Sequence, residues 1–242
     1  STAYVLVEYD GDQVLPITRE LITAAKVFES VTAVVVGAAG AHEPLVPQLA
    51  ALGADAIVAA VGADTTQRVV LPAADALSML AASAPGPILV GAGVTGNEIA
   101  GRLAARLASG VLCDVVQVNS DLTALMSIFG DAIEVSTAVG GSSPIYTMRH
   151  GATEVPAKPT PGAGVVSTFE LPAASEKDVT VTKFVPAVKG DRPDLTNAKV
   201  VVAGGRGVDS EENFHTEVEA LADALGELPR SEERRVGKEC RS

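Results

Sequence analysis

Residues 192–207 read RPDLTNAKVVVAGGRG and join three features: a domain boundary, an apolar strand and a basic glycine loop. Pro193 favours an extended entry into the strand, because its ring fixes its own backbone and restricts the residue before it. The apolar run 200–203 is typical of a strand that is buried on both faces of a parallel sheet. This stretch therefore predicts an α/β fold with a functional loop at the carboxyl end of a strand.

The loop itself carries the candidate cofactor-binding residues Gly204, Gly205, Arg206 and Gly207. Glycines allow the backbone to come close to a ligand, and an arginine can donate two hydrogen bonds to a phosphate or hold positive charge near a flavin. A Gly-Gly-Arg-Gly sequence without its neighbours is also compatible with an ordinary strand-to-helix turn and a solvated arginine. The neighbours decide between the two interpretations.

A helix is expected to follow this loop. Ser210 is a good N-cap residue, and Gly226 is a plausible end. Between them the apolar residues recur at helical spacing, at Phe214, Val218, Leu221, Ala222 and Leu225. The segment is therefore predicted to be one β-loop-α unit.

With Glu212, Asn213 and Phe214, the stretch resembles the start of the flavin domain in the alpha subunit of electron transfer flavoproteins. There an R-P-(D/E)-L-T segment leads into V-V-V-x-G-G-R-G and then E-N-F. The resemblance extends back through residues 96–107 and 5–8, and covers nearly everything up to about residue 228. It implies that Arg206 contacts FAD, at the start of a second, Rossmann-like domain.

The resemblance also implies a function and partners. The family carries electrons from flavin dehydrogenases, notably the acyl-CoA dehydrogenases of fatty acid beta-oxidation, towards a membrane quinone reductase. Its members are electron carriers rather than substrate-converting enzymes. The alpha subunit forms a heterodimer with a beta subunit that resembles the N-terminal domain and carries AMP.

The last residues, 230–242, read RSEERRVGKECRS and resemble an in-frame translation of a sequencing adapter. We expect this tail to be an artefact that replaces most of the flavin domain, so that the chain does not retain FAD; a genuine charged tail is the alternative. The expected organisation is an N-terminal α/β domain over 1–190, which pairs with the beta subunit. It is followed by the truncated start of an FAD domain over 191–229 and by the tail over 230–242.

Composition agrees with a globular protein, because 47% of the residues are apolar. A net charge of −12 and an aromatic content of 3% argue against a nucleic-acid partner. No apolar stretch is long enough to insert into a membrane, and the N-terminus shows no targeting signal, which favours a cytoplasmic protein. Cys113 is expected to be buried, and His42, His150 and His215 are interpreted as surface or satisfied residues. No metal site is expected.

Along the first domain, strands alternate with helices in the order typical of a doubly wound, mostly parallel sheet. The expected strands are 3–8, 32–36, 56–61, 87–90 and 111–118, and the expected helices are 18–30, 45–52, 71–82 and 96–108. Three closely spaced runs, 125–129, 133–138 and 144–148, are predicted as added antiparallel strands. Two extended runs, 165–171 and 179–188, are expected to complete the domain before a linker at 189–197.

One motif offers a rival function. Residues Gly91 to Gly96 read GAGVTG, which fits the G-x-G-x-x-G pattern of dinucleotide sites between a strand and a helix, and Asp114 could bind the ribose. The chain would then be a nicotinamide-dependent Rossmann oxidoreductase. Alternatively, the turn only packs the helix against the sheet. A third possibility is a non-catalytic domain that binds a partner, since the sequence shows no nucleophile elbow or phosphate loop.

Overall fold

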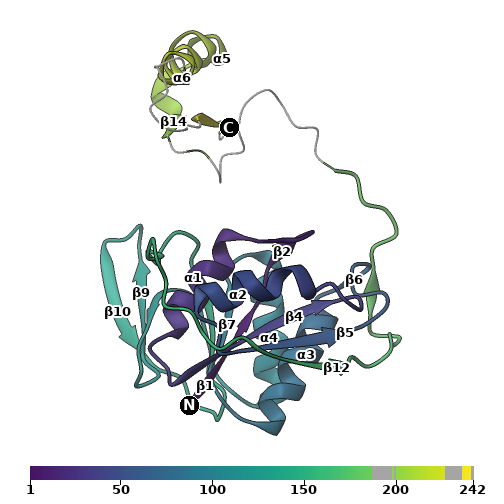
Figure 1. Cartoon of the computed structure of the whole chain (residues 1–242). Coiled ribbons are helices and arrows are strands. Elements are labelled where there is room, and N and C mark those ends of the chain that lie inside the picture. Colours follow the sequence, from purple (N-terminus) through teal and green to yellow (C-terminus); the bar gives the residue numbers. More distant parts are fainter. Residues whose placement is uncertain (187–197, 199, 227–235, 241–242) are drawn as a thin grey trace. The chain divides into compact units, whose positions relative to one another are not determined.

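The computed structural model describes residues 1–186, 198, 200–226 and 236–240 (Figure 1). Its internal contacts divide the chain into two compact units, Ser1–Thr182 and Lys183–Ser242. The predicted linker at 189–197 and the predicted domain border after residue 190 lie outside the described residues. The first six residues of the opening stretch, 192–197, and Lys199 also lie outside them.

A nine-stranded sheet with the order β10-β9-β8-β11-β7-β1-β4-β5-β12 forms the centre of the first unit. In this spatial order, all neighbours from β8 across to β12 pair in parallel. At the other edge, β9 pairs antiparallel with both β8 and β10. The strands are β1 (Thr2–Leu6), β4 (Ser30–Gly37), β5 (Ala56–Val61), β7 (Ile88–Gly91), β8 (Val111–Val118), β9 (Ala124–Ile128), β10 (Ile133–Thr137), β11 (Ile145–Met148) and β12 (Val165–Glu170). The predicted α/β class, mostly parallel with added antiparallel strands, is confirmed.

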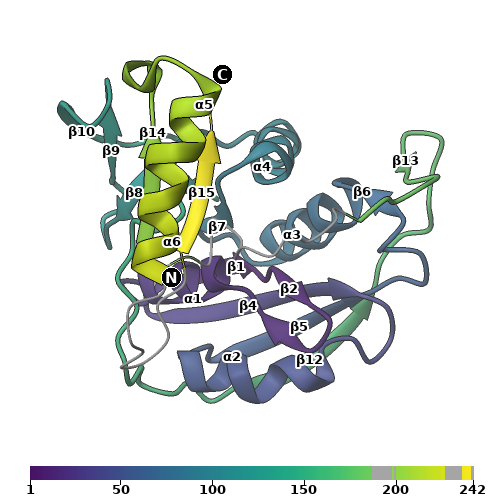
Figure 2. The same cartoon turned by 90° about the horizontal axis from the view of Figure 1, so that it is seen from above.

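Helices cover both faces of this sheet, as the doubly wound prediction requires. Figure 2 shows α2 on one side of β4 and β5 and α3 on the other. One core packs α1 and α2 with the short turn η1, and the other packs α3 and α4. The elements are α1 (Pro16–Ala25), η1 (Glu43–Leu45), α2 (Val46–Leu52), α3 (Leu71–Ser83) and α4 (Val94–Leu107).

The order of the strands reverses at β1. From β1 the chain moves to β4 and β5 on one side, and β7 then starts the half of the sheet that lies on the other side. The carboxyl ends of β1 and β7 therefore flank a topological switch point, where open α/β sheets bind their ligands. The glycine turn that begins at Gly91 lies at this point.

The prediction for residues 144–148 was wrong in direction. These residues form β11, which lies between β7 and β8 and pairs in parallel with both. All four residues of β11 are buried, as expected for an inner parallel strand. The short turns before it suggested a meander, but only β9 and β10 form the antiparallel hairpin.

The end of the first unit also differs from expectation. Of the predicted strand 179–188, the described residues show only β13 (Val179–Thr180), which pairs antiparallel with β6 (Arg68–Val69). A further two-residue hairpin joins β2 (Tyr9–Asp10) to β3 (Gln13–Val14). Such short pairs lack an alternating pattern that a sequence could reveal.

In the second unit, β14 (Val200–Gly204) runs parallel to β15 (Val236–Cys240). Residues 236–240 belong to the tail that the sequence predicted to be an artefact, and in the structure they form the strand partner of β14. The expectation that β14 is buried on both faces was wrong, because Val201 is 47% exposed and Val200 and Val202 are half-buried. A two-stranded sheet with one helix covers a strand incompletely.

The helix after the loop forms in three consecutive pieces: α5 (Glu211–Asn213), a π-helical segment (Phe214–Glu219) and α6 (Ala220–Gly226). Phe214, Val218 and Ala222 are buried at intervals of four residues, whereas Leu221 is 52% exposed. A π-helical segment has more residues per turn than an α-helix, so the stripe follows a spacing of four and misses position 221.

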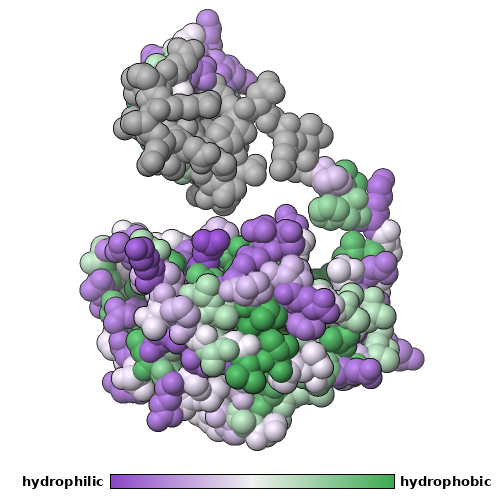
Figure 3. All heavy atoms as spheres, viewed as in Figure 1, coloured by the Kyte–Doolittle hydropathy of each residue, from purple (hydrophilic) through white to green (hydrophobic). Residues whose placement is uncertain are grey.

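On the face of the first unit shown in Figure 3, polar and apolar residues are interspersed. Within the described part of the chain, no helix is both long and apolar enough to cross a membrane. The same residues contain no group of three or more His, Cys, Asp or Glu side chains placed to hold a metal ion.

Candidate functional site

The loop at residues 204–207 is held against the start of its helix by short-range hydrogen bonds. Within it, η3 (Arg206–Val208) is a single 3-10 turn. The Asn213 side chain donates to the carbonyl of Val208 at 3.0 Å, and Ser210 Oγ accepts from the Asn213 N–H at 3.1 Å. The predicted N-cap at Ser210 is therefore confirmed, and the loop has a defined shape.

Arg206 projects from this loop into solvent. It is exposed, and its guanidinium makes no hydrogen bond or ion pair with any residue that the structure describes. Several other arginines of the described residues bind carboxylates, as Arg149 does with Asp114 and Asp131. An uncommitted guanidinium keeps its planar set of donors available for an anion.

The three glycines of the loop differ in the space available for a side chain. A Cβ added to Gly204 would lie 2.8 Å from Val218 Cγ2 and 2.9 Å from Phe214 Cδ2, so packing of the helix requires a glycine there. A Cβ added to Gly205 or Gly207 would meet nothing within 4 Å. The open space beside Arg206 therefore comes from Gly205 and Gly207.

The rival motif between Gly91 and Gly96 is a tightly packed turn. A Cβ on Gly96 would lie 1.8 Å from the carbonyl oxygen of Gly91, and one on Gly91 would lie 2.6 Å from Glu8 Oε1. Gly93 has a φ of +145°, which favours glycine for conformational reasons. Each glycine of the pattern thus has a structural reason that needs no ligand.

Two carboxylates further weaken a dinucleotide site at this turn. The Asp114 carboxylate accepts from Arg149 Nη2 at 2.8 Å and from Nε at 3.1 Å, so the proposed ribose-binding group is already engaged. Glu8 lies directly against Gly91, where a pyrophosphate would approach the helix N-terminus. Burial raises the pKa of the Glu8 carboxyl, and the nearby charge of His150 offsets part of this effect.

The single residues noted in the sequence have mixed outcomes. Cys113 is exposed, contrary to expectation, because successive residues of a strand point to opposite faces and its neighbour Leu112 takes the buried face of β8. His150 Nε2 lies 2.8 Å from the carbonyl of Ala92, and His215 Nδ1 lies 2.6 Å from a Glu219 oxygen. His42 differs, since its Nδ1 is buried without a described hydrogen-bond partner.

Sequence reasoning missed the residues that shape the two turns. The sequence indicated Asn213 only as part of a motif, although its side chain binds the Val208 carbonyl at the end of the glycine loop. Arg149 was not singled out, because its partner Asp114 lies 35 residues away in the sequence. The local signal for Asn213 was available, since Asn is a frequent partner of backbone groups near helix starts.

Comparison with known proteins gives concordant matches. The family model described as "Electron transfer flavoprotein domain" matches residues 3–174. The chain is 45% identical over 225 residues to the electron transfer flavoprotein subunit alpha of Mycobacterium leprae, covering 93% of this chain and 70% of that protein. The subunit alpha of Mycobacterium tuberculosis is 48% identical over 223 residues, covering 92% and 69% respectively. That of Syntrophomonas wolfei is 34% identical over 231 residues, covering 92% and 70%.

Proposed function

Since the chain belongs to the electron transfer flavoprotein family and is similar to its alpha subunits, as its motifs predicted, we propose that it carries electrons on an FAD held at Arg206. Family membership supports a flavoprotein of electron transport. The observation that carries the choice of site is the exposed, uncommitted guanidinium of Arg206 between the open Gly205 and Gly207. These residues fit a dianionic ligand that needs close backbone approach.

The role of each residue follows from its position. When FAD is bound, its isoalloxazine ring supplies the redox chemistry. Arg206 donates paired hydrogen bonds to the diphosphate or places a positive charge near the ring, where it favours the reduced, more negative form. Gly205 and Gly207 leave room for the cofactor, and Gly204 brings the helix close to β14. No side chain needs to act as an acid, base or nucleophile, which is appropriate for an electron carrier.

The proposed route runs from acyl-CoA dehydrogenases to a membrane quinone reductase, in the cytoplasm, with a beta subunit that carries AMP as the partner. Relatives that are named alpha subunits support the heterodimer. The net charge of −12 suits steering towards basic docking patches. The proposed contact with the beta subunit lies within 125–148, where Phe129 is 79% exposed. Coexpression with a beta subunit and size-exclusion chromatography tests this, and separate elution at micromolar concentration would contradict it.

The cofactor site is tested by FAD titration with flavin fluorescence, first on the chain as given, where we expect weak binding or none, and then on a heterodimer whose alpha subunit carries a full flavin domain. The following variants are compared in that heterodimer. Loss of a charge-assisted hydrogen bond costs about 1.5–3 kcal/mol, so Arg206→Ala should weaken binding roughly ten- to hundredfold. Arg206→Lys should recover part of the affinity, because it keeps the charge but loses the planar donor set. Arg102→Ala is the matched control, since Arg102 is also a surface arginine but pairs with Glu98.

An unchanged dissociation constant for Arg206→Ala would refute the site. A parallel titration with NADH addresses the rival function. NADH binding that disappears in Asp114→Asn, together with unchanged FAD binding in Arg206→Ala, would favour the nicotinamide-dependent enzyme instead.

A further inference from the structure

The last part of the first unit, residues 172–182, is held by something other than apolar burial. Each of these residues is exposed except Asp178, which is half-buried. A cavity of about 430 Å³ separates part of the segment from α3 and α4, and Arg102, Arg106 and Lys177 border it. Leu171, just before the segment, still packs against the core. After Thr182 the chain passes into the second unit.

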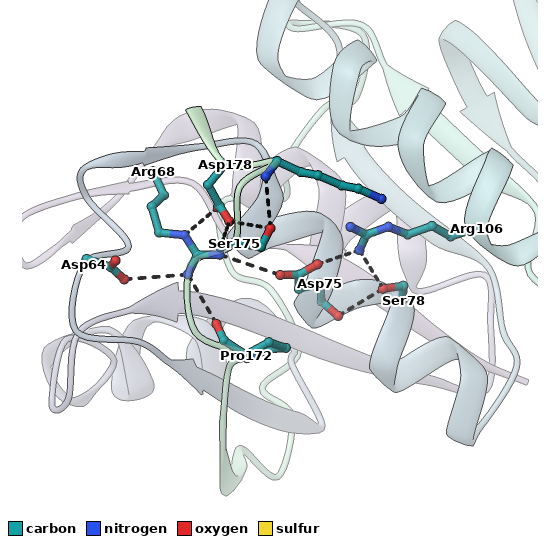
Figure 4. Close-up of polar contacts among 9 residues, drawn as sticks. Asp64, Arg68, Asp75, Ser78, Arg106, Pro172, Ser175 and Asp178 are labelled. Carbon is teal, nitrogen blue, oxygen red and sulfur yellow. Dashed lines mark hydrogen bonds and ion pairs between the residues drawn. The ribbon is translucent and has the colours of Figure 1, made fainter. Parts of the chain in front are cut away.

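The buried side chain of Arg68 binds this segment (Figure 4). The Arg68 side chain is 3% exposed, and its Nε donates to Asp178 Oδ1 at 2.6 Å. Its Nη1 donates to the carbonyl of Pro172 at 3.3 Å. The Asp178 side chain is itself only 4% exposed. One side chain of β6 thus holds the segment at two points, which are 104 and 110 residues away from it in sequence.

Asp178 connects Arg68 to another residue of the segment by hydrogen bonds. Its Oδ2 accepts from the backbone N–H of Ser175 at 2.6 Å and from the Ser175 hydroxyl at 3.2 Å. On the other side, β13 pairs with β6, and the Val181 N–H donates to the carbonyl of Gln67 at 2.7 Å. The contacts on both sides of Asp178 therefore meet at the strand that carries Arg68.

The environment keeps the guanidinium charged in spite of its burial. The hydrogen bond with Asp178 raises the pKa of Arg68, and the Arg68 bond lowers the pKa of the Asp178 carboxyl. Asp64 and Asp75 add carboxylates at 3.6 Å and 3.8 Å from the guanidinium nitrogens. Figure 4 shows Asp75 between Arg68 and Arg106. Removing Asp178 would therefore release the segment and still leave Arg68 with counter-charges.

We propose that Arg68 is a positioning residue that moors residues 172–182 to the first unit and so fixes the point, after Thr182, at which the chain leaves that unit. This rests on the proposed function only in that the second unit carries the proposed FAD loop. Without the mooring, these eleven residues would span an r.m.s. distance of about 17–20 Å as a free chain, so residue 183 would no longer start from a fixed place on the first unit.

Limited trypsin digestion of the whole chain provides the test, because Lys177 lies inside the moored segment and Lys183 lies just beyond it. In the parent chain, cleavage after Lys183 should be faster than cleavage after Lys177. Asp178 directly follows the scissile bond and itself slows trypsin there, so each rate is divided by the rate for a free peptide of the same sequence. On this scale, loss of a charge-assisted bond in Asp178→Ala should speed cleavage after Lys177 about 10- to 100-fold. Glu98→Gln is the matched control, because it removes a carboxylate from a surface pair that makes no bond to the segment.

Hydrogen exchange on the same variants separates mooring from general stability. In Asp178→Ala, the amides of 175–181 should lose protection while β5 and β12 keep theirs. Unchanged cleavage after Lys177 would overturn the proposal, and so would equal loss of protection in β5 and β12. Neither measurement involves flavin, so its failure is distinguishable from failure of the FAD titration.

Discussion

Gly204→Ala tests whether packing of the helix requires a glycine at the end of β14. The added Cβ would lie 2.8 Å from Val218 Cγ2 and 2.9 Å from Phe214 Cδ2, well inside the optimal carbon separation of about 3.5–4.0 Å. Phe214 is 5% exposed and Val218 is 9% exposed, so neither side chain has much room to turn away. The helix would have to shift by several tenths of an ångström.

Two opposing terms set the expected magnitude. Overpacking of this kind costs about 1–3 kcal/mol. Replacing a glycine by alanine also lowers the conformational entropy of the unfolded chain, which stabilises the folded state by about 0.4–1 kcal/mol. The net loss should therefore be on the order of 1–2 kcal/mol, which corresponds to a factor of about 5–30 in the ratio of closed to open molecules.

Hydrogen exchange over residues 214–226 measures this loss directly, because amide protection reports local opening. Gly204→Ala should exchange about 5–30 times faster there. Gly205→Ala and Gly207→Ala are matched controls, since their added Cβ atoms meet nothing within 4 Å. Parent-like exchange in Gly204→Ala would refute the packing argument, as would equal acceleration in Gly205→Ala.

Three further outcomes are expected. Gly96→Ala should destabilise the first unit by about 3 kcal/mol or more in chemical denaturation, because its Cβ would lie 1.8 Å from the backbone oxygen of Gly91; a parent-like midpoint would contradict this. Glu8→Gln should stabilise the first unit at pH 7, because burial raises the pKa of Glu8 above 4.5 and its ionised form is penalised in the folded state. Below pH 4.5 the Glu8 carboxyl is protonated in the folded and the unfolded chain, so the parent and Glu8→Gln should have similar free energies of unfolding. As pH rises above 4.5, the parent should become less stable than Glu8→Gln. An equal difference at all pH values would show another cause. Asn213→Ala removes the bond to the Val208 carbonyl, which costs about 0.5–1.5 kcal/mol, and should weaken FAD binding while Arg206 is intact; unchanged affinity in the FAD titration would show that the loop keeps its shape without it.

Much of the fold was predictable because it depends on local spacing. Alternating apolar runs and helical stripes predicted α3 and α4 to within two residues at each end, and Ser210 marked the start of its helix. The direction of β11 was not predictable, because its place between β7 and β8 is set by partners that are distant in sequence. The hold of Arg68 on Asp178 was missed for the same reason, since 110 residues separate them.

The candidate site shows the same division within a single β-loop-α unit. The conformation of the loop depends on Ser210, Asn213 and Gly204, which act within a few residues of Arg206, so a motif could indicate it. The burial of β14 depends on strands that the motif does not contain, and Val201 is accordingly exposed although its run is uniformly apolar. Loop shape and strand burial can therefore be perturbed separately. Substitutions at Arg206 should act on ligand affinity without changing exchange in the helix, whereas Gly204→Ala should accelerate that exchange whether or not a ligand binds.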